Sequence, residues 1–255
     1  MYQAVVFFDL DGTLLDSKKK VPISSLTAIQ ILKAKKILPV IATGRNLLMV
    51  KKIMQVTHIS TVISANGSYI QYQKQPLNII SIPVSVIQRL IAVAKQFNHP
   101  LAFQTADQIV LNAKNFLTRR AYLHHSVNPE IKADFFKDHL INFINIFTID
   151  HDQFYQNKFA NQLSIVRNSD KCLDVMKSGV SKQLGIKILL QRLNLLKCPT
   201  YAFGDGLNDL EMFKEVKHPI AMNNGCQQCK DYAEYITTSN DHDGIERGLR
   251  YFNLI

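Results

Sequence analysis

Long apolar runs are missing from this chain of 255 residues. No stretch reaches the roughly 18 uninterrupted apolar residues that a membrane-spanning helix needs, so we expect no membrane partner. The N-terminal apolar residues follow no basic segment, and Asp9 and Asp11 interrupt them. We therefore expect no secretory signal and a cytoplasmic location. Internal repeats and low-complexity segments are also missing.

Cysteine is scarce. The four cysteines, Cys172, Cys198, Cys226 and Cys229, are too few for a disulfide framework in a chain of this length. Cys226 and Cys229 have the spacing of a zinc or redox pair, but no second Cys or His pair lies near them. The spacing alone therefore assigns this pair no role.

Acidic residues are outnumbered, since 30 Lys and Arg face 20 Asp and Glu and give a formal charge of +10. This excess favours acidic partners such as phosphorylated metabolites, nucleic acid or an anionic surface. The lysines are scattered, however, and the longest run is only Lys18–Lys20. Because no basic stripe with aromatic residues is present, we do not expect nucleic-acid binding. None of these features indicates an oligomeric state.

Two carboxylates follow directly after the apolar run Ala4–Phe8, at Asp9 and Asp11. Two like charges about 4 Å apart repel by about 4 kcal/mol at an effective dielectric constant near 20. A bound cation or a shared catalytic task would justify that cost. A calcium loop is excluded, because the twelfth position counted from Asp9 is Lys20 where a bidentate Glu is needed. A simple turn without a bound ion is still an alternative interpretation of these residues.

Apolar strands alternate with helices in the first and last thirds of the chain. We expect strands over 4–8, 38–42, 61–65, 201–203, 218–222 and 235–237. Ser24 or Ser25 is expected to cap the first helix, and Ser181 a later one. Such apolar strands, separated by helices, indicate an α/β fold with a parallel sheet that helices cover on both faces.

The middle of the chain, 83–180, has a different pattern. A helix from Pro83 leads into strand-like segments around 101–111, 141–149 and 163–166, with helices near 116–122 and 153–160. We therefore predict a discontinuous core domain, 1–82 and 181–255, and an inserted α+β domain over 83–180.

Polar residues follow the predicted strands of the core at Asp9 and Asp11, Thr43 and Gly44, Asn66, Asp205 and Asn223. Ligands of an open parallel sheet bind beyond the carboxyl ends of its strands, so these residues are expected at one edge. Asp205 and Asp209 could serve only as helix caps. Together with Asp9 and Asp11, however, they favour a hard cation with oxygen ligands, and Mg²⁺ above all.

These segments resemble the motifs of the haloacid dehalogenase-like superfamily, in its Cof-type branch of sugar-phosphate phosphatases. The four motifs correspond to Asp9–Leu15, Ala42–Arg45, Lys182 and Gly204–Asp209. Asn66–Gly67, Ala221–Asn224 and Thr238–Gly244 resemble the branch as well. The resemblance covers essentially the whole chain and implies a Rossmann-like core with an inserted cap. Gln183 departs from the pattern, because the branch usually has Gly there.

The resemblance implies a role for each matching residue. Asp9 would be the nucleophile that forms an aspartyl-phosphate, and Asp11 the general acid and base. Mg²⁺ would be held by Asp9, the Asp11 carbonyl and Asp205, with Asp209 and Asn208 in support. The phosphate-binding residues would be Leu10, Thr43, Gly44, Lys182 and Asn208, and further substrate contacts would come from Arg45, Asn66 and Asn223.

The implied activity is a Mg²⁺-dependent phosphatase that acts on small phosphorylated metabolites, with specificity in the cap. His124 and His125 in the cap are conceivable contacts, or simply residues of a surface helix. A phosphomutase of the same superfamily is an alternative, as is a non-catalytic binder of phosphate or nucleic acid. The presence of Asp9, Asp11, Lys182 and Asp205 argues against the binder. The sequence does not name the substrate.

Overall fold

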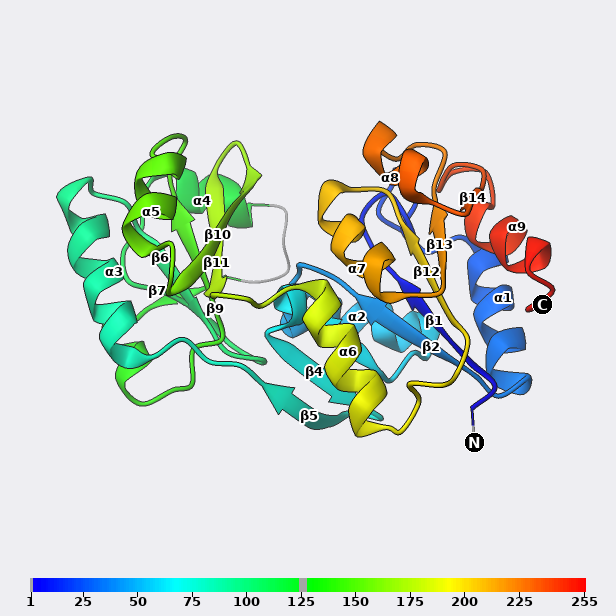
Figure 1. Ribbon diagram of the computed structural model, residues 1–255. Helices are drawn as coiled ribbons and strands as arrows, with labels where there is room; N and C mark the ends of the chain where they lie inside the picture. Colours follow the sequence, from blue (N-terminus) through cyan, green and yellow to red (C-terminus); the bar gives the residue numbers. More distant parts are fainter. Residues whose placement is uncertain (1, 124–127) are drawn as a thin grey trace. The chain divides into compact units, whose positions relative to one another are not determined.

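The computed structural model describes residues 2–123 and 128–255, and their contacts divide them into two compact units (Figure 1). The first unit comprises Met1–Gly44, Val50–Asn78 and Ser181–Ile255, and the second comprises Arg45–Met49 and Ile79–Val180. The sequence placed the corresponding boundaries at 82/83 and 180/181. His124 and His125 lie outside the described residues.

The first unit is built on an eight-stranded sheet in the described part of the chain, with the strand order β14-β13-β12-β1-β2-β3-β4-β5. All pairings from β14 to β3 are parallel, and β4 runs antiparallel to β3. The strands are β1 (Ala4–Phe8), β2 (Ile37–Ala42), β3 (Val62–Ser64), β4 (Tyr69–Tyr72), β5 (Gln75–Ile79), β12 (Thr200–Gly204), β13 (His218–Ala221) and β14 (Tyr235–Ile236).

Helices cover both faces of this sheet, which confirms the predicted α/β class (Figure 1). On one face, Ile186, Met212 and Cys229 share a buried core with Val5 and Phe7. They belong to α6 (Lys182–Arg192), α7 (Leu210–Glu215) and α8 (Gln227–Tyr232). On the other face lie α1 (Ile23–Ala34) and α9 (Gly244–Tyr251), which contact each other. Because every residue of β1 is buried, the strand is apolar throughout.

The remaining short elements connect these strands. The helix α2 (Leu47–Thr57) follows β2, and from Val50 onward its residues belong to the first unit. The single 3₁₀ turns η1 (Ala65–Gly67) and η3 (Leu207–Asp209) follow β3 and β12. The prediction that Ser24 or Ser25 caps the first helix is wrong. The helix begins at Ile23 after Pro22, a residue whose fixed φ suits a helix start.

The second unit has its own six-stranded sheet within the described residues, in the order β10-β11-β9-β6-β7-β8. Its strands are β6 (Leu101–Gln104), β7 (Ile109–Leu111), β8 (Glu130–Ile131), β9 (Phe143–Phe147), β10 (Leu163–Ser169) and β11 (Cys172–Lys177). The segment 101–111, expected as one strand-like stretch, is a pair of antiparallel strands, because Thr105–Gln108 forms a turn closed by a backbone hydrogen bond.

The two faces of the second sheet differ in character. Leu90, Ile144, Tyr155 and Leu173 belong to a large apolar core beneath α3 (Val84–Gln96) and α5 (Asp152–Phe159), with the 3₁₀ turn η2 (Phe135–Lys137) alongside. A smaller apolar cluster lies beneath α4 (Phe116–Tyr122). In neither unit do the described residues include a helix that is both long and apolar enough to cross a membrane.

Candidate active site

Parallel pairing brings the predicted site residues of the first unit to one edge of its sheet. Phe8 at the end of β1 pairs with Ile41 of β2 and with Phe203 of β12. The residues that follow these three strands therefore lie at the same edge of the sheet, beyond the carboxyl ends of the strands. Asp9 comes directly after Phe8, and its backbone N–H donates to the carbonyl of Phe203 at 3.0 Å.

Three carboxylates meet at this edge. Asp9, Asp205 and Asp209 each place a carboxylate oxygen within 4.8 Å of the others. Asp9 and Asp209 are buried, at 7% and 1% exposure. Such a group of hard oxygen donors suits a cation of the Mg²⁺ type.

Lys182 contacts two of these carboxylates and is 1% exposed. Its Nζ donates to Asp9 Oδ1 at 2.5 Å and to Asp209 Oδ1 at 2.7 Å. The Ser181 side chain caps α6 by accepting from the Leu184 N–H at 3.2 Å, which fixes the first turn that carries Lys182. Burial lowers the pKa of Lys182, but the charges of Asp209 and Asp9 outweigh it, and the net pKa is raised.

A single ammonium does not balance the three carboxylates. Burial raises the pKa of Asp9 to about 7, against the opposing effect of Lys182 and with the help of Asp209. Burial also raises the pKa of Asp205 to about 6, although its hydrogen bond from Thr13 acts in the opposite direction. When all three carboxylates are ionised, the one ammonium leaves an excess of negative charge, and a divalent cation among these oxygens would neutralise it.

Backbone groups hold the loop Gly204–Asp209, named the acidic loop here, in place. Asp209 Oδ2 accepts the N–H groups of Asp205 at 2.9 Å and Gly206 at 3.0 Å. A Cβ at Gly204 would lie only 2.6 Å from the Cβ of Asp209, so the loop requires glycine there. Asp209 is thus a buried organiser of the loop as well as a member of the carboxylate cluster.

Sequence reasoning missed three residues that position the first motif. Thr13 Oγ1 donates to Asp205 Oδ1 at 2.6 Å, and Lys19 Nζ donates to Asp11 Oδ1 at 2.9 Å. Gly12 has φ +82° and lies so close to Asp205 that an added Cβ would be 2.3 Å from its Oδ2. Thr13 and Gly12 belong to the quoted motif, whereas nothing in the sequence marks Lys19.

Asp11 lies apart from the carboxylate cluster. Its side chain is 42% exposed and forms the ion pair with Lys19. The neighbouring Leu10 has a fully buried side chain, so any contact of this residue with a phosphate would use its backbone.

Thr43, Gly44 and Asn66 lie together beyond β2 and β3. The Asn66 N–H donates to the Thr43 carbonyl at 3.0 Å. A Cβ at Gly44 would lie 3.0 Å from Asn66 Oδ1. This Oδ1 is buried and has no hydrogen-bond partner among the described residues.

The other predicted site residues are placed differently. Asn208 and Asn223 are exposed, and Arg45 groups with the second unit.

Gln183, the departure from the family pattern, donates to Glu215 Oε2 at 3.2 Å without breaking α6. Cys226 and Cys229 are free thiols, and Cys229 is buried with its Sγ 3.0 Å from the Gly206 carbonyl.

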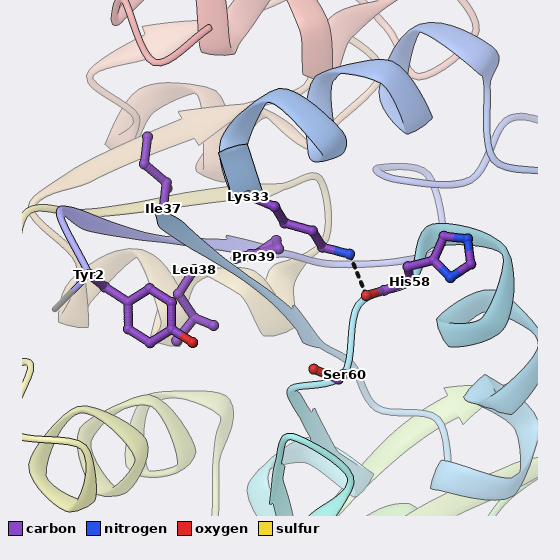
Figure 2. Close-up of a pocket in the computed structure, with 7 residues that line it drawn as sticks. All are labelled: Tyr2, Lys33, Ile37, Leu38, Pro39, His58 and Ser60. Atoms are coloured by element: carbon purple, nitrogen blue, oxygen red, sulfur yellow. Dashed lines mark hydrogen bonds between the residues drawn. The ribbon is translucent and has the colours of Figure 1, made fainter. Parts of the chain in front are cut away.

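A cavity of about 300 Å³ lies at the opposite, amino-terminal edge of the sheet (Figure 2). None of the predicted site residues lines it. Lys33 reaches toward this cavity, but its Nζ already donates to the carbonyls of Thr57 and His58. The lining residues are Tyr2, Lys33, Ile37, Leu38, Pro39, His58 and Ser60.

Comparison with known proteins identifies the family of this chain. The model of the haloacid dehalogenase-like hydrolase family matches residues 6–249. The chain belongs to this family. The match confirms the resemblance to this superfamily that the motifs indicated.

Two relatives from Bacillus subtilis (strain 168) resemble this hydrolase over nearly its whole length. The protein named "Putative phosphatase YkrA" is 31% identical over 258 residues, with 100% of both chains covered. The protein named 5-amino-6-(5-phospho-D-ribitylamino)uracil phosphatase YitU is 24% identical over 279 residues and covers 98% of each chain.

Solved structures share the fold. A hypothetical protein from Geobacillus kaustophilus HTA426 superposes with a TM-score of 0.91 at 29% identity, covering 99% of this chain and 100% of the other. The subclass IIB sugar phosphatase BT4131 gives a TM-score of 0.85 at 24% identity, with 99% and 100% covered.

Proposed function

We propose that this hydrolase is a Mg²⁺-dependent phosphatase that acts on phosphomonoesters of small metabolites through an aspartyl-phosphate on Asp9. The observation that carries the proposal is the buried cluster at the end of β1, where Asp9 contacts Lys182 beside Asp205 and Asp209. The phosphatase names of YkrA and YitU favour the same reaction class. We expect the enzyme to work in the cytoplasm.

The metal would be held by Asp9, Asp205 and the Asp11 carbonyl, with Asp209 in support. The carboxylate oxygens and their excess negative charge fit a hard divalent cation. When bound, Mg²⁺ offsets the repulsion between these carboxylates and a phosphate dianion. The protein's own residues supply every other part of the proposed reaction.

In the first half of the reaction, a carboxylate oxygen of Asp9 attacks phosphorus and the bond from phosphorus to the substrate oxygen breaks. Asp11 gives its proton to the departing alkoxide. In the second half, Asp11 takes a proton from water, which attacks phosphorus and releases inorganic phosphate from Asp9. Lys19 forms an ion pair with Asp11 at 2.9 Å and so contacts the residue to which both proton transfers are assigned.

Phosphate binding is assigned to groups around the cluster. A lysine ammonium has three donors, and Lys182 uses two of them on Asp9 and Asp209. We assign the third donor, the Thr43 hydroxyl and the backbone amides of Gly44 and Leu10 to the phosphate oxygens. Such donors stabilise the charge that develops in the transition state.

The second unit is assigned to the selection of the substrate, as the cap of this enzyme. We expect Arg45, which groups with that unit, and Asn66, Asn208 and Asn223 to contact the substrate or its phosphate. Exchange of 83–180 for the corresponding segment of a relative would then change the order of preferred substrates.

The test is the release of inorganic phosphate from a panel of phosphorylated metabolites, with Mg²⁺ or with EDTA. The wild type is compared with Asp9→Asn and with the matched control Asp231→Asn, an exposed acid on α8. We expect Mg²⁺-dependent release that Asp9→Asn abolishes and Asp231→Asn leaves unchanged. No release by well-folded wild type would contradict the proposal, and turnover only with a bisphosphate activator would indicate a mutase.

A further inference from the structure

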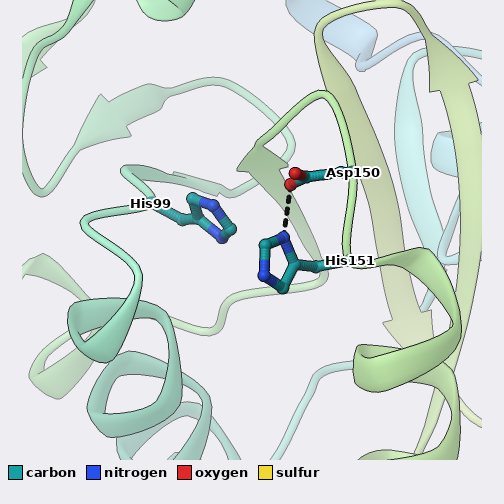
Figure 3. A group of neighbouring side chains, drawn as sticks. All are labelled: His99, Asp150 and His151. Atoms are coloured by element: carbon teal, nitrogen blue, oxygen red, sulfur yellow. Dashed lines mark hydrogen bonds and ion pairs between the residues drawn. The ribbon is translucent and has the colours of Figure 1, made fainter.

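A second group of metal-ligating side chains lies in the second unit, outside the carboxylate cluster. His99 lies between α3 and β6, and Asp150 and His151 directly precede α5. Each of the three has a ring nitrogen or carboxylate oxygen within 4.8 Å of those of the other two (Figure 3). The proposed reaction uses none of these residues.

The His99 ring is held in place by a hydrogen bond to a buried residue. Its Nδ1 lies 3.0 Å from the hydroxyl of Tyr155, which is fully buried. A histidine that binds a metal through one nitrogen generally forms a hydrogen bond through the other, which fixes its tautomer and ring plane. With Nδ1 bonded to this hydroxyl, Nε2 is left to take a metal ion.

The segment that carries Asp150 and His151 is also fixed. His151 Nδ1 contacts Asp150 Oδ1, and the same carboxylate accepts from Thr148 Oγ1 at 2.9 Å (Figure 3). Arg167 donates to the Thr148 carbonyl at 2.6 Å and forms an ion pair with Asp152. The carboxylate and the imidazole are therefore presented by a braced connection between β9 and α5.

An aromatic wall closes one side of this group. The Phe97 ring stacks on His99 at 5.5 Å and lies 4.5 Å from His151, with Phe154 packed against Phe97 at 5.1 Å. The other side is open, since the side chains of His151 and Asp150 are 33% and 61% exposed. An ion could enter from solvent and keep a water molecule as a further ligand.

We propose that His99, Asp150 and His151 form a separate site for a borderline divalent transition metal, of which Zn²⁺ is the type. Two imidazoles and one carboxylate suit Zn²⁺, Co²⁺ or Ni²⁺, whereas the oxygen-only cluster of the first unit suits Mg²⁺. The ion would tie the end of α3 to the start of α5, the two helices over the apolar core of the second sheet. The site therefore stabilises the second unit.

The test is a Zn²⁺ titration in competition with a chromophoric chelator, in millimolar Mg²⁺ to occupy the oxygen cluster. His99→Gln and His151→Asn each remove one ligand, and Asn tolerates the left-handed backbone at position 151, where φ is +66°. The matched control is His218→Gln, because His218 also contacts a carboxylate, Glu234 Oε2 at 2.7 Å, in the first unit.

We expect one Zn²⁺ per chain in the wild type, a loss of affinity of at least about tenfold in either cluster variant, and no change in His218→Gln. Zn²⁺ should also raise the unfolding temperature of the wild type but not that of the cluster variants. NMR of the wild-type imidazoles tests the site without any substitution. Unchanged binding in both variants, or Zn²⁺ that leaves the His99 and His151 signals unmoved, would overturn the proposal.

Discussion

Asp205 lies against the backbone of Gly12, and this contact joins the first motif to the acidic loop. The contact requires the absence of a side chain at position 12, because an added Cβ would be 2.3 Å from Asp205 Oδ2. Thr13 then holds the other carboxylate oxygen at 2.6 Å. The position of one proposed metal ligand therefore depends on two residues that would bind no metal themselves.

Gly12→Ala should displace the Asp205 carboxylate and weaken the binding of Mg²⁺. The matched control is Gly179→Ala, since Gly179 has φ +80° but open space around its Cβ position. Both substitutions share the cost of a left-handed backbone, about 1 kcal/mol. We expect the concentration of Mg²⁺ that gives half-maximal phosphate release to rise at least about tenfold in Gly12→Ala only. Equal responses of the two variants would contradict this prediction.

Residue types and their positions after strands were enough to predict Asp9, Asp205 and Asp209 as neighbours, whereas Lys182 was added only by the resemblance to the family. They could not predict which atoms pair. Lys19 lies in a run of exposed lysines, and only the fold shows that it reaches Asp11. The contact of Thr13 with Asp205 joins positions 192 apart, and no local pattern reports such a pair.

At the scale of elements, β11 carries a buried acid between apolar residues of the same strand. Asp174 is 5% exposed, and its oxygens accept from the Asn145 and Asn168 side chains, each at 2.8 Å. Burial raises its pKa to about 7, against the effect of these hydrogen bonds. Leu173 and Val175 face the large apolar core, so Asp174 lies on the opposite face of the strand.

Asp174→Asn should change how stability depends on pH. Between pH 4 and 7 the folded wild type retains a proton that the unfolded chain has lost, so its stability falls as the pH rises through this window. The variant does not titrate there. We expect the unfolding free energy of the variant, relative to wild type, to rise from pH 5 to pH 8 by at most about 3 kcal/mol.

Urea unfolding at each pH measures this difference. Asp134→Asn, which changes an exposed acid of the same unit, is the control and should show no such trend. A constant difference between Asp174→Asn and wild type across the pH range would contradict the raised pKa.

The sequence predicted β1, β2, β3, β12, β13 and β14 of the first sheet, because most of these are short apolar runs, but it missed β4 and β5. It also missed β11, because Asp174 interrupts the apolar residues and the segment lacks the continuous apolar pattern of a buried strand. It also misplaced the first helix cap, because Ser24 instead donates to Asp243 Oδ1 at 2.6 Å, a contact that only the fold creates.

At the scale of the whole molecule, the chain has a formal charge of +10, whereas the carboxylate cluster is itself acidic. The long-range field would attract phosphorylated substrates, while the bound cation and Lys182 would act only at short range. On this basis the charge affects the rate of encounter rather than the chemical step.

Phosphate release should therefore depend on ionic strength. We expect kcat/KM for a phosphorylated substrate to fall about three- to tenfold from 20 to 500 mM of a salt with a weakly binding anion, with little change in kcat. A series of glycerol solutions of matched osmolality is the control. A KM that does not respond to salt would show that the basic excess plays no part in substrate capture.

The ion pair between Lys182 and Asp9 joins residues 173 positions apart. On the ribosome, at about 5 to 20 residues per second, Asp9 would emerge about 10 to 35 seconds before its counter-ion. During that interval β1 also lacks β12, its parallel neighbour through the pairing of Val5 with Thr200. The nascent chain thus carries an unneutralised acid and an open sheet edge, which makes it a candidate for chaperone binding during synthesis.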